Sequence, residues 1–445
     1  MTMPAEARNN SVLYEGFAIC PYCRRIIEAR EVIRNGFIYL LQKCPYDNIE
    51  SEFLLQKADR YAFDSQSARS KEASRIKMEK IFKIGQRLTD VKDVPNWRSI
   101  NDVFFLLTKK CNISCRVCLD QDSRAREDIP LEFVEKQMRI FKNVRVFLEG
   151  GEPTMRGDLK EIISRIKSPR NKIAIITNGV KLSDLSYLDE LRKHGLDIAV
   201  ITLDGFDPES SMIIRGDSYD VAPVLNAVRN AAFLHIETWI QPLILKGVNE
   251  TQIERILLFA ADNANITRIF FNTLFLSAGL RKKGFGENHL LSKDELEGLI
   301  AVPLGIEVEY FSLFFSVKAA IINFIMKFFP FANNSMPVPH QLYLKRENGK
   351  LLPLLELSEL KEIRDIFKRK AYYNFCRYKY LKLFYYLLKN RFSIIRFEEE
   401  LSRRKVLTVV AGTPRPLEAF SLGYFSDDII FDRKGIVAVR RAADA

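Results

Sequence analysis

Six short runs of β-branched and aromatic residues recur between residues 102 and 275, and longer segments separate them. The runs are 103–107, 144–148, 172–176, 198–203, 238–245 and 269–272. In the first intervening segment, apolar residues recur at spacings of three and four, which places one apolar face along a helix (Leu131, Val134, Met138 and Phe141). Strands that alternate with such helices are typical of βα units around a parallel sheet. The pattern predicts an α/β fold.

The composition is that of a folded protein with several domains. Of 445 residues, 47% are hydrophobic and 28% are charged, which excludes collagen-like, low-complexity and wholly disordered chains. Lys and Arg outnumber Asp and Glu by 68 to 56, and this basic balance favours phosphate-bearing partners such as nucleic acid, anionic lipid or nucleotide. Seven cysteines are too few for a disulfide scaffold, and residues 1–10 lack the apolar stretch of an export signal. We therefore expect a cytoplasmic protein.

Changes in composition divide the chain into five predicted parts. They are a cysteine-knuckle unit (1–60), a charged helical linker (61–95), the α/β unit (96–280), a basic, aromatic and mainly helical cap (281–405) and a short β segment (406–445). Lys318 and Lys327 interrupt the apolar stretch 310–331, so we expect no membrane-spanning helix there.

Three cysteines follow the first predicted strand directly. Cys111, Cys115 and Cys118 are spaced so that one tight loop can point three thiols at one centre. Thiolates are ligands for zinc and for iron–sulfur clusters, and a complete site usually takes four protein ligands. Three cysteines predict a cluster with one position open to an outside ligand. The alternative is a structural zinc site that is completed from elsewhere in the chain.

This C-x3-C-x2-C spacing at the end of a first strand resembles the radical S-adenosylmethionine (SAM) superfamily. The resemblance implies that the three cysteines hold a [4Fe–4S] cluster, and that the amino and carboxylate groups of SAM bind its fourth iron. It further implies a partial (β/α)6 barrel and a low-potential electron donor of the ferredoxin or flavodoxin type. The implied reaction is reductive cleavage of SAM to a 5′-deoxyadenosyl radical, which abstracts hydrogen from a substrate C–H bond.

A second motif of that family follows the second predicted strand. Gly150, Gly151 and Glu152 precede Pro153 and resemble the GGEP motif of the superfamily. The resemblance implies that the glycine backbone lets SAM approach closely and that the SAM ammonium binds at the strand edge. The alternative is an ordinary turn between a strand and a helix.

Further candidates follow the third and fourth strands. Thr177 and Asn178, and then Thr202 and Asp204, occupy positions where relatives place polar groups near the ribose and the substrate. Arg215 lies where relatives often carry an Arg-Gly pair, and its guanidinium is predicted to bind the SAM carboxylate. Each group lies beyond the carboxyl end of a predicted parallel strand, where parallel barrels assemble their active sites. Thr202 and Asp204 also suit turn-forming and capping roles.

Two copies of a short cysteine frame lie near the start of the chain. They read Cys20-Pro-Tyr-Cys23 and Cys44-Pro-Tyr-Asp47, and the residues between them predict a hairpin that turns at Asn35-Gly36. The pair resembles the knuckles of zinc ribbons and rubredoxin, which implies zinc or mononuclear iron bound by Cys20, Cys23, Cys44 and Asp47. The alternative is a knuckle that has lost its metal, because Asp is a rarer structural zinc ligand than Cys or His.

A knuckle of this kind ahead of such a barrel resembles the group that includes archaeal tetraether lipid synthase and a radical SAM pterin methylase. In that group the second frame commonly reads Cys-Pro-x-His, and this chain has Asp47 in place of the histidine. Further cysteines that would bind auxiliary clusters are absent from this sequence, which implies a simpler chemistry.

The basic, aromatic stretch 372–397 offers two interpretations of the partners. Together with the apolar helix before it, it suits peripheral contact with an anionic inner membrane face, and hence a lipid substrate. An ordinary helical cap with solvated lysines accounts for it equally well. A nucleic-acid-binding protein with a zinc ribbon is a further alternative, but it leaves the strand-end motifs unexplained.

Overall fold

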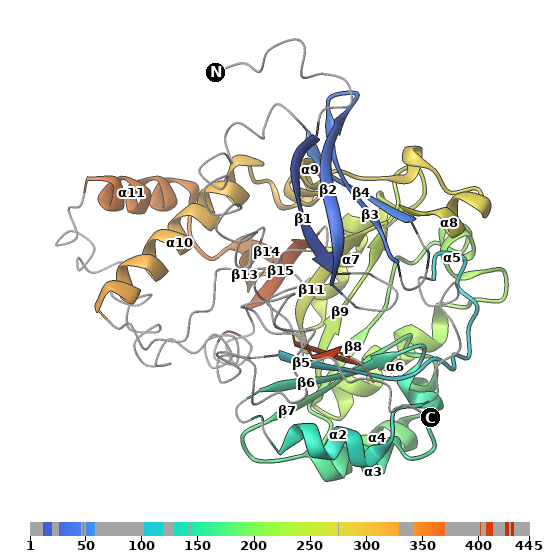
Figure 1. The fold of residues 1–445 in the computed structure, drawn as a ribbon. Helices are drawn as coiled ribbons and strands as arrows, with labels where there is room; N and C mark the ends of the chain where they lie inside the picture. The colour runs from blue at the N-terminus through green and yellow to red at the C-terminus, as the bar shows by residue number, and fades with distance from the viewer. Residues whose placement is uncertain are drawn as a thin grey trace.

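The computed structural model describes two β-sheets and the helices that pack on them (Figure 1). It describes residues 12–19, 26–45, 48, 50–57, 102–118, 128–139, 141, 144–274, 276–328, 341–369, 401, 406–412, 423–426 and 429–430. The predicted linker 61–95 and the stretch 372–397 lie outside these residues.

Six parallel strands form the centre of the larger sheet and follow one another in chain order. They are β5 (Asp102–Thr108), β6 (Arg145–Gly150), β7 (Lys172–Thr177), β8 (Ile198–Ile201), β9 (Glu237–Ile240) and β11 (Ile266–Thr273). Each strand pairs in parallel with the next. Five of the six predicted strands are confirmed, the remaining one is divided in two as described below, and the order of the strands agrees with a partial (β/α)6 barrel.

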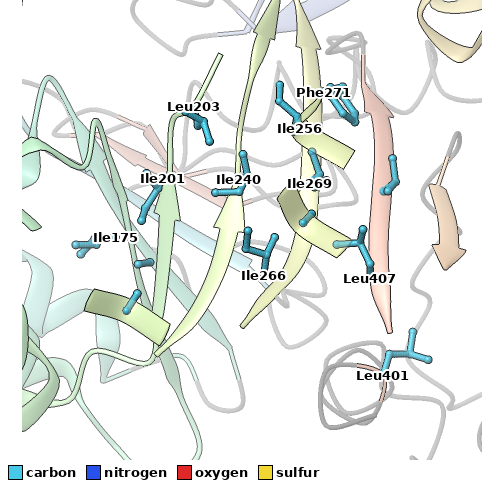
Figure 2. Packing of buried hydrophobic residues seen from close by; sticks show 14 of the residues in the cluster. Ile175, Ile201, Leu203, Ile240, Ile256, Ile266, Ile269, Phe271, Leu401 and Leu407 are labelled. Carbon is cyan, nitrogen blue, oxygen red and sulfur yellow. The ribbon is translucent and has the colours of Figure 1, made fainter. Parts of the chain in front are cut away.

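Helices cover one face of these strands. They are α2 (Leu131–Met138), α3 (Leu159–Ile166), α4 (Leu185–His194), α6 (Ala222–Phe233) and α7 (Gln252–Asp262). Two short turns, η7 (Pro153–Met155) and η8 (Val180–Ser183), and helix α5 (Pro208–Arg215) lie just past strand ends. Strand residues such as Ile175, Ile201, Ile240 and Ile269 are completely buried in this layer (Figure 2). Burial on both faces explains why the strands read as nearly continuous apolar runs.

Aromatic side chains fill the opposite, inner face of the barrel strands. Phe104 and Phe147 stack with their ring centroids 4.5 Å apart. Trp239 lies 5.5 Å from Phe147 and 5.8 Å from Phe270. These rings and the small aliphatic side chains beside them form one buried cluster. We call this layer the aromatic floor, and it leaves the carboxyl ends of the strands as the place for polar groups.

The predicted strand at 238–245 is wrong in one respect, because the structure divides it in two. β9 ends at Ile240, and β10 (Leu243–Ile244) begins after Pro242. Proline has no N–H group to donate to a strand ladder, so the ladder breaks there. The carbonyl oxygen of Pro242 instead accepts a hydrogen bond from the N–H of Asn272, over 2.9 Å.

The larger sheet continues beyond the barrel strands at both edges. On one side lie β15 (Leu407–Gly412), parallel to β11, and then the antiparallel strands β13 (Gln341–Glu347) and β14 (Lys350–Pro353). On the other side lie β16 (Gly423–Ser426), parallel to β5, and β17 (Ile429–Ile430). The strand predicted at 406–410 is confirmed. The β13–β14 hairpin, which turns at Asn348-Gly349, was not predicted.

The smaller sheet comes from the start of the chain, and we call it the leader sheet. It contains β1 (Val12–Ile19), β2 (Ile26–Arg34), β3 (Phe37–Lys43), β4 (Glu50–Lys57) and β12 (Leu276–Ser277). The predicted hairpin is confirmed, since Asn35 and Gly36 take φ values of 49° and 78° between paired strands β2 and β3. β12 follows β11 directly, so the leader sheet is attached at the carboxyl end of the last barrel strand.

The remaining helices follow β12. They are α8 (Ala278–Lys282), η9 (Glu287–His289), α9 (Lys293–Leu304), α10 (Glu309–Phe328) and α11 (Leu357–Lys368). Within the described ranges, no single helix is long and apolar enough to cross a membrane, although residues 287–304 and 309–317, bent by 100°, satisfy those two criteria together.

Candidate active site

The three cysteines of the C-x3-C-x2-C spacing lie in one loop after β5, which we call the cysteine loop. None of the three forms a disulfide bond: Cys111 is exposed, Cys115 is buried and Cys118 is partly buried. Desolvation raises the pKa of the Cys111 thiol, a backbone hydrogen bond from Ile113 opposes this rise, and the charge of Glu152 adds to it. A thiolate without a counter-charge is therefore disfavoured here, and a bound metal centre would favour it.

The end of α5 holds the cysteine loop. The backbone N–H groups of Arg116 and Val117 donate to the carbonyl oxygen of Ile214 over 3.0 and 3.4 Å. The buried Val117 side chain belongs to the same apolar cluster as Ile214, beneath the leader sheet. Arg116 also forms an exposed ion pair with Asp217, at 2.7 Å. Hydrogen bonds, apolar packing and charge therefore fix the segment between the second and third cysteines.

Gly150 and Gly151 allow the cysteine loop to lie against the end of β6. The N–H of Gly151 donates to the carbonyl oxygen of Thr108 over 2.7 Å. A Cβ atom at Gly150 would lie 2.2 Å from that oxygen, and one at Gly151 would lie 2.5 Å from the carbonyl oxygens of Lys109 and Lys110. Only glycine fits at such distances. The two glycines thus make room for the backbone of the cysteine loop, a contact that the prediction of SAM approach did not include.

The buried carboxylate of Glu152 ties the end of β6 to the end of β7. Its Oε1 accepts hydrogen bonds from the N–H and hydroxyl groups of Thr154, over 3.0 and 2.6 Å, and from the Thr177 hydroxyl over 2.8 Å. Its Oε2 accepts from the N–H of Asn178 over 2.8 Å. Oε1 is saturated, whereas Oε2 retains acceptor capacity.

Asn178 connects β7 to the cysteine loop. Its Nδ2 donates to Oδ1 of Asn112 over 2.7 Å and makes a longer contact of 3.9 Å with Sγ of Cys111. The Thr177 hydroxyl, besides binding Glu152, accepts from the N–H of Gly179 over 3.0 Å. Thr177 and Asn178 therefore organise the strand end and the loop together.

Asp204 and Arg215 form a largely buried bidentate ion pair. Arg215 Nε lies 2.5 Å from Asp204 Oδ2, and Nη2 lies 2.9 Å from Oδ1. The third nitrogen, Nη1, donates to Sγ of Cys115 over 3.5 Å. Desolvation acts against the charge of Arg215, but Asp204 outweighs it and holds the pKa of Arg215 well above its ordinary value. The pair thus presents a fixed positive charge to a cysteine sulfur.

Asn249 supports this ion pair, although no motif in the sequence indicated it. This fully buried side chain donates from Nδ2 to the carbonyl oxygens of Asp204 and Leu243, over 2.9 and 2.8 Å. Its Oδ1 accepts from the N–H of Leu245 over 2.8 Å, and the N–H of Leu243 donates to Oδ1 of Asp204 over 2.8 Å. The glycine at position 247, which predicts a turn after the broken strand, is the one feature of the sequence that lies near Asn249.

Replacing Asp204 with asparagine is expected to destabilise the fold strongly. The variant leaves the buried guanidinium of Arg215 without its counter-charge, a loss that typically costs about 3–5 kcal/mol. Asp217→Asn is the matched control, because the Arg116–Asp217 pair is exposed and such pairs contribute about 0–1 kcal/mol. Urea denaturation of both variants measures the difference. Equal unfolding midpoints for the two variants would contradict the role assigned to Asp204.

The remaining predicted site residues are Thr202 and the four knuckle residues. In the part of the chain that the structure describes, no side-chain hydrogen bond connects them to this network. Thr202 follows β8, and its N–H donates to the carbonyl oxygen of Thr177 over 3.0 Å. Of the knuckle residues, Cys44 is buried at the end of β3, while Cys20, Cys23 and Asp47 lie outside the described residues.

The donor set of the cysteine loop fits an iron–sulfur cluster. Three cysteines share one loop without a disulfide bond, and N–H groups of Arg215 and Asn178 point at two of the sulfurs, as hydrogen bonds do around such clusters. Among the described residues, no three Cys, His, Asp or Glu side chains are gathered as a site for a single metal ion. A [4Fe–4S] cluster binds its thiolates on separate irons, so it does not need that arrangement.

Sequence comparisons identify relatives of known class. Residues 105–260 match the family model of the Radical SAM superfamily. A 7,8-dihydro-6-hydroxymethylpterin dimethyltransferase of Methanocaldococcus jannaschii is 24% identical over 383 residues, which are 79% of this chain and 72% of that protein. A GTP 3′,8-cyclase of Aquifex aeolicus is 30% identical over 157 residues, which are 33% of this chain and 48% of that protein. The chain thus matches about half the length of the cyclase.

Solved structures are only weakly similar to this chain. SuiB of Streptococcus suis bound to S-adenosylmethionine has a TM-score of 0.37 and 18% identity, and the match covers 45% of this chain and 46% of SuiB. The protein anSMEcpe, solved with AdoMet and a peptide, has a TM-score of 0.38 and 12% identity over 60% of this chain and 82% of its own. The segment that matches the family model contains the cysteine loop and every strand-end motif through Arg215. Residues 105–260 of this chain are therefore a Radical SAM domain, and members of that superfamily use a [4Fe–4S] cluster and SAM.

Proposed function

We propose that this enzyme cleaves SAM at the cysteine loop and functionalises a C–H bond of a substrate bound above the aromatic floor. The observation that carries the proposal is the convergence of the cysteine loop with the ends of β6, β7 and α5. Three cysteines, a glycine edge, a buried carboxylate and a largely buried guanidinium meet within one hydrogen-bonded network. Each part comes from the carboxyl end of a strand or from the segment that follows it, which is where parallel barrels catalyse reactions.

The cofactors supply the difficult chemistry. A [4Fe–4S] cluster held by Cys111, Cys115 and Cys118 would supply one electron, drawn from a low-potential donor of the ferredoxin or flavodoxin type, for the reductive cleavage of SAM. The overall products would be methionine, 5′-deoxyadenosine and a substrate that has lost one hydrogen atom. The protein's own residues bind, orient and shield the reacting groups.

Glu152 and Arg215 take different parts in this proposal. Glu152 Oε2 keeps acceptor capacity, which suits the ammonium group of SAM next to the glycine edge. Arg215 directs two of its nitrogens at Asp204 and the third at Cys115, so it serves as a positioning residue for the thiolate. This geometry favours that role over the predicted pairing of Arg215 with the SAM carboxylate.

Modification of a C–H bond on a nitrogen heterocycle is the more specific form of the proposal. It is supported by the alignment with the M. jannaschii dimethyltransferase, which extends over 79% of this chain and therefore well beyond the barrel. The lipid substrate suggested by residues 372–397 rests on a stretch outside the described residues.

Product analysis tests the reaction. Cluster-loaded protein is incubated without oxygen with SAM and dithionite, and 5′-deoxyadenosine is measured by liquid chromatography and mass spectrometry. We expect 5′-deoxyadenosine and methionine in equal amounts, and neither without the reductant. Protein that carries a full complement of cluster iron, binds SAM and yet forms no 5′-deoxyadenosine would contradict the proposal.

A further inference from the structure

Four strands of the barrel end in polar side chains on the inner face. They are Glu149 of β6, Thr202 after β8, Gln241 after β9 and Asn272 of β11. Side chains alternate between the two faces of a strand. The residues that precede these four, Leu148, Ile201, Ile240 and Phe271, belong to the completely buried outer layer. Figure 2 shows Ile201, Ile240 and Phe271 in this layer. The four polar side chains must therefore face inward, and we call them the polar ring.

The polar ring lies one layer above the aromatic floor. Two positions earlier on the same strands stand Phe147, Val200, Trp239 and Phe270, which all belong to the inner cluster. The polar ring residues are half-buried, whereas Phe147, Val200 and Trp239 beneath them are buried. The ring is thus more exposed than the three buried side chains beneath it.

Three members of the polar ring lack hydrogen-bond partners. In the part of the chain that the structure describes, the side chains of Thr202, Gln241 and Asn272 make no hydrogen bond, and only their backbone groups are bonded. Polar neighbours on the same rim behave differently, since Asp204 and Asn249 are both fully engaged. A half-buried amide that is not needed to hold the fold together is a group available to a ligand.

The polar ring is also next to the proposed reaction site. The N–H of Thr202 donates to the carbonyl oxygen of Thr177, and Asp204 follows two residues later with its ion pair to Arg215. The N–H of Asn272 binds the carbonyl of Pro242, whose neighbour Leu243 donates to Asp204. A molecule held by the ring would therefore lie beside the arginine that contacts Cys115.

We propose that the polar ring is the substrate site and that it binds a small planar molecule with adjacent hydrogen-bond donors and acceptors, of the nucleobase or pterin kind. Gln241 and Asn272 each present a donor and an acceptor in one plane, which is how amides bind a heterocycle edge in pairs. An alkyl chain would leave these groups unpaired at a cost of about 1–3 kcal/mol each, so the ring discriminates against lipid. This inference rests on the proposed function for the reaction, but the binding site is argued independently of it.

Binding of pterin tests the inference. The full-length, cluster-loaded chain with SAM is titrated with pterin and followed by pterin fluorescence, with guanosine and 1-decanol as competitors. We expect pterin to bind, guanosine to compete, and decanol to have no effect. Gln241→Leu and Asn272→Leu are expected to weaken pterin binding about 5- to 100-fold each, as the loss of one or two hydrogen bonds requires. The matched control, Asn226→Leu, lies exposed on α6 and should leave binding unchanged.

The outcomes separate the site from the reaction. Displacement of pterin by decanol but not by guanosine, no pterin binding at all, or unchanged binding in both leucine variants would overturn the inference. Pterin binding without any 5′-deoxyadenosine would refute the proposed function and leave the site intact. Because the side chains of Gln241 and Asn272 make no hydrogen bond to other described residues, the leucine variants should melt at the same temperature as the wild type. Gln241→Glu and Asn272→Asp, which keep the shape, give the same test if the leucine variants unfold.

Discussion

Replacing Cys115 with alanine is expected to abolish cluster binding and to lower 5′-deoxyadenosine formation by more than about a hundredfold. Loss of a group that merely orients a metal ligand typically costs 10–100-fold, and Cys115 is itself a predicted ligand. Its sulfur also receives the N–H of Arg215, so the variant removes the acceptor of that contact. Iron content per chain, the visible absorption of the cluster and product analysis are measured on the same preparation.

Cys376→Ala is the control for this substitution. Cys376 lies outside the described residues, stands apart from both cysteine groups in the sequence and belongs to no predicted site. We expect this variant to keep its cluster iron and its 5′-deoxyadenosine yield. A Cys115→Ala protein with wild-type cluster absorption would show that the cysteine loop is not the cluster site.

The second large effect is expected for Gly151→Ala. The new methyl group would lie 2.5 Å from two backbone carbonyl oxygens of the cysteine loop, and backbone atoms cannot move aside as a flexible side chain can. The loop must shift, which breaks the 2.7 Å hydrogen bond from Gly151 to Thr108 and the 2.8 Å hydrogen bond from Glu152 to Lys110. We expect the free energy of unfolding to fall by about 1–3 kcal/mol and cluster iron to be lost.

Gly157→Ala provides a close comparison. A Cβ atom at Gly157 meets nothing within 4 Å, and Gly157 does not have a positive φ. This variant should keep its cluster and change the free energy of unfolding by no more than about 0.5 kcal/mol. Urea denaturation and iron analysis of the two alanine variants decide the matter. If Gly151→Ala retained iron as well as Gly157→Ala does, the close approach of β6 to the cysteine loop would not matter for the cofactor.

The barrel was predictable because its strands are buried on both faces. Residues 144–148 and 172–176 carry little besides apolar and β-branched side chains, and such runs separated by amphipathic helices allow few other folds. The break at Pro242 was missed because the apolar run continues on both sides of it. The β13–β14 hairpin was missed because only the first half of β13 is apolar: the buried Leu342, Tyr343 and Leu344 are followed directly by Lys345, Arg346 and Glu347.

The sequence predicted the motifs of the site, but it did not predict which side chains pair with one another. The cysteine spacing and the glycine pair were found because close backbone approach permits few residue types. Which groups pair with one another depends on the fold, as the partnership of Arg215 with Asp204 and Cys115 shows. Gln241 and Asn272 gave no signal, because a single polar residue at a strand end is common. These two residues become candidate ligand-binding groups only when the structure shows that their side chains face inward and make no hydrogen bond to other described residues.

The attachment of the leader sheet through β12 constrains the order in which the protein can be completed. β1 to β4 are synthesised first, yet Leu276 of β12 and the side chains that share its cluster, such as Val117 and Ile214, leave the ribosome later. Until then, Val32, Tyr39 and Leu54 have no such surface to pack on. Long-range closure of this kind is slow and exposes apolar residues to aggregation. The leader sheet therefore cannot be completed until almost the whole barrel has been synthesised.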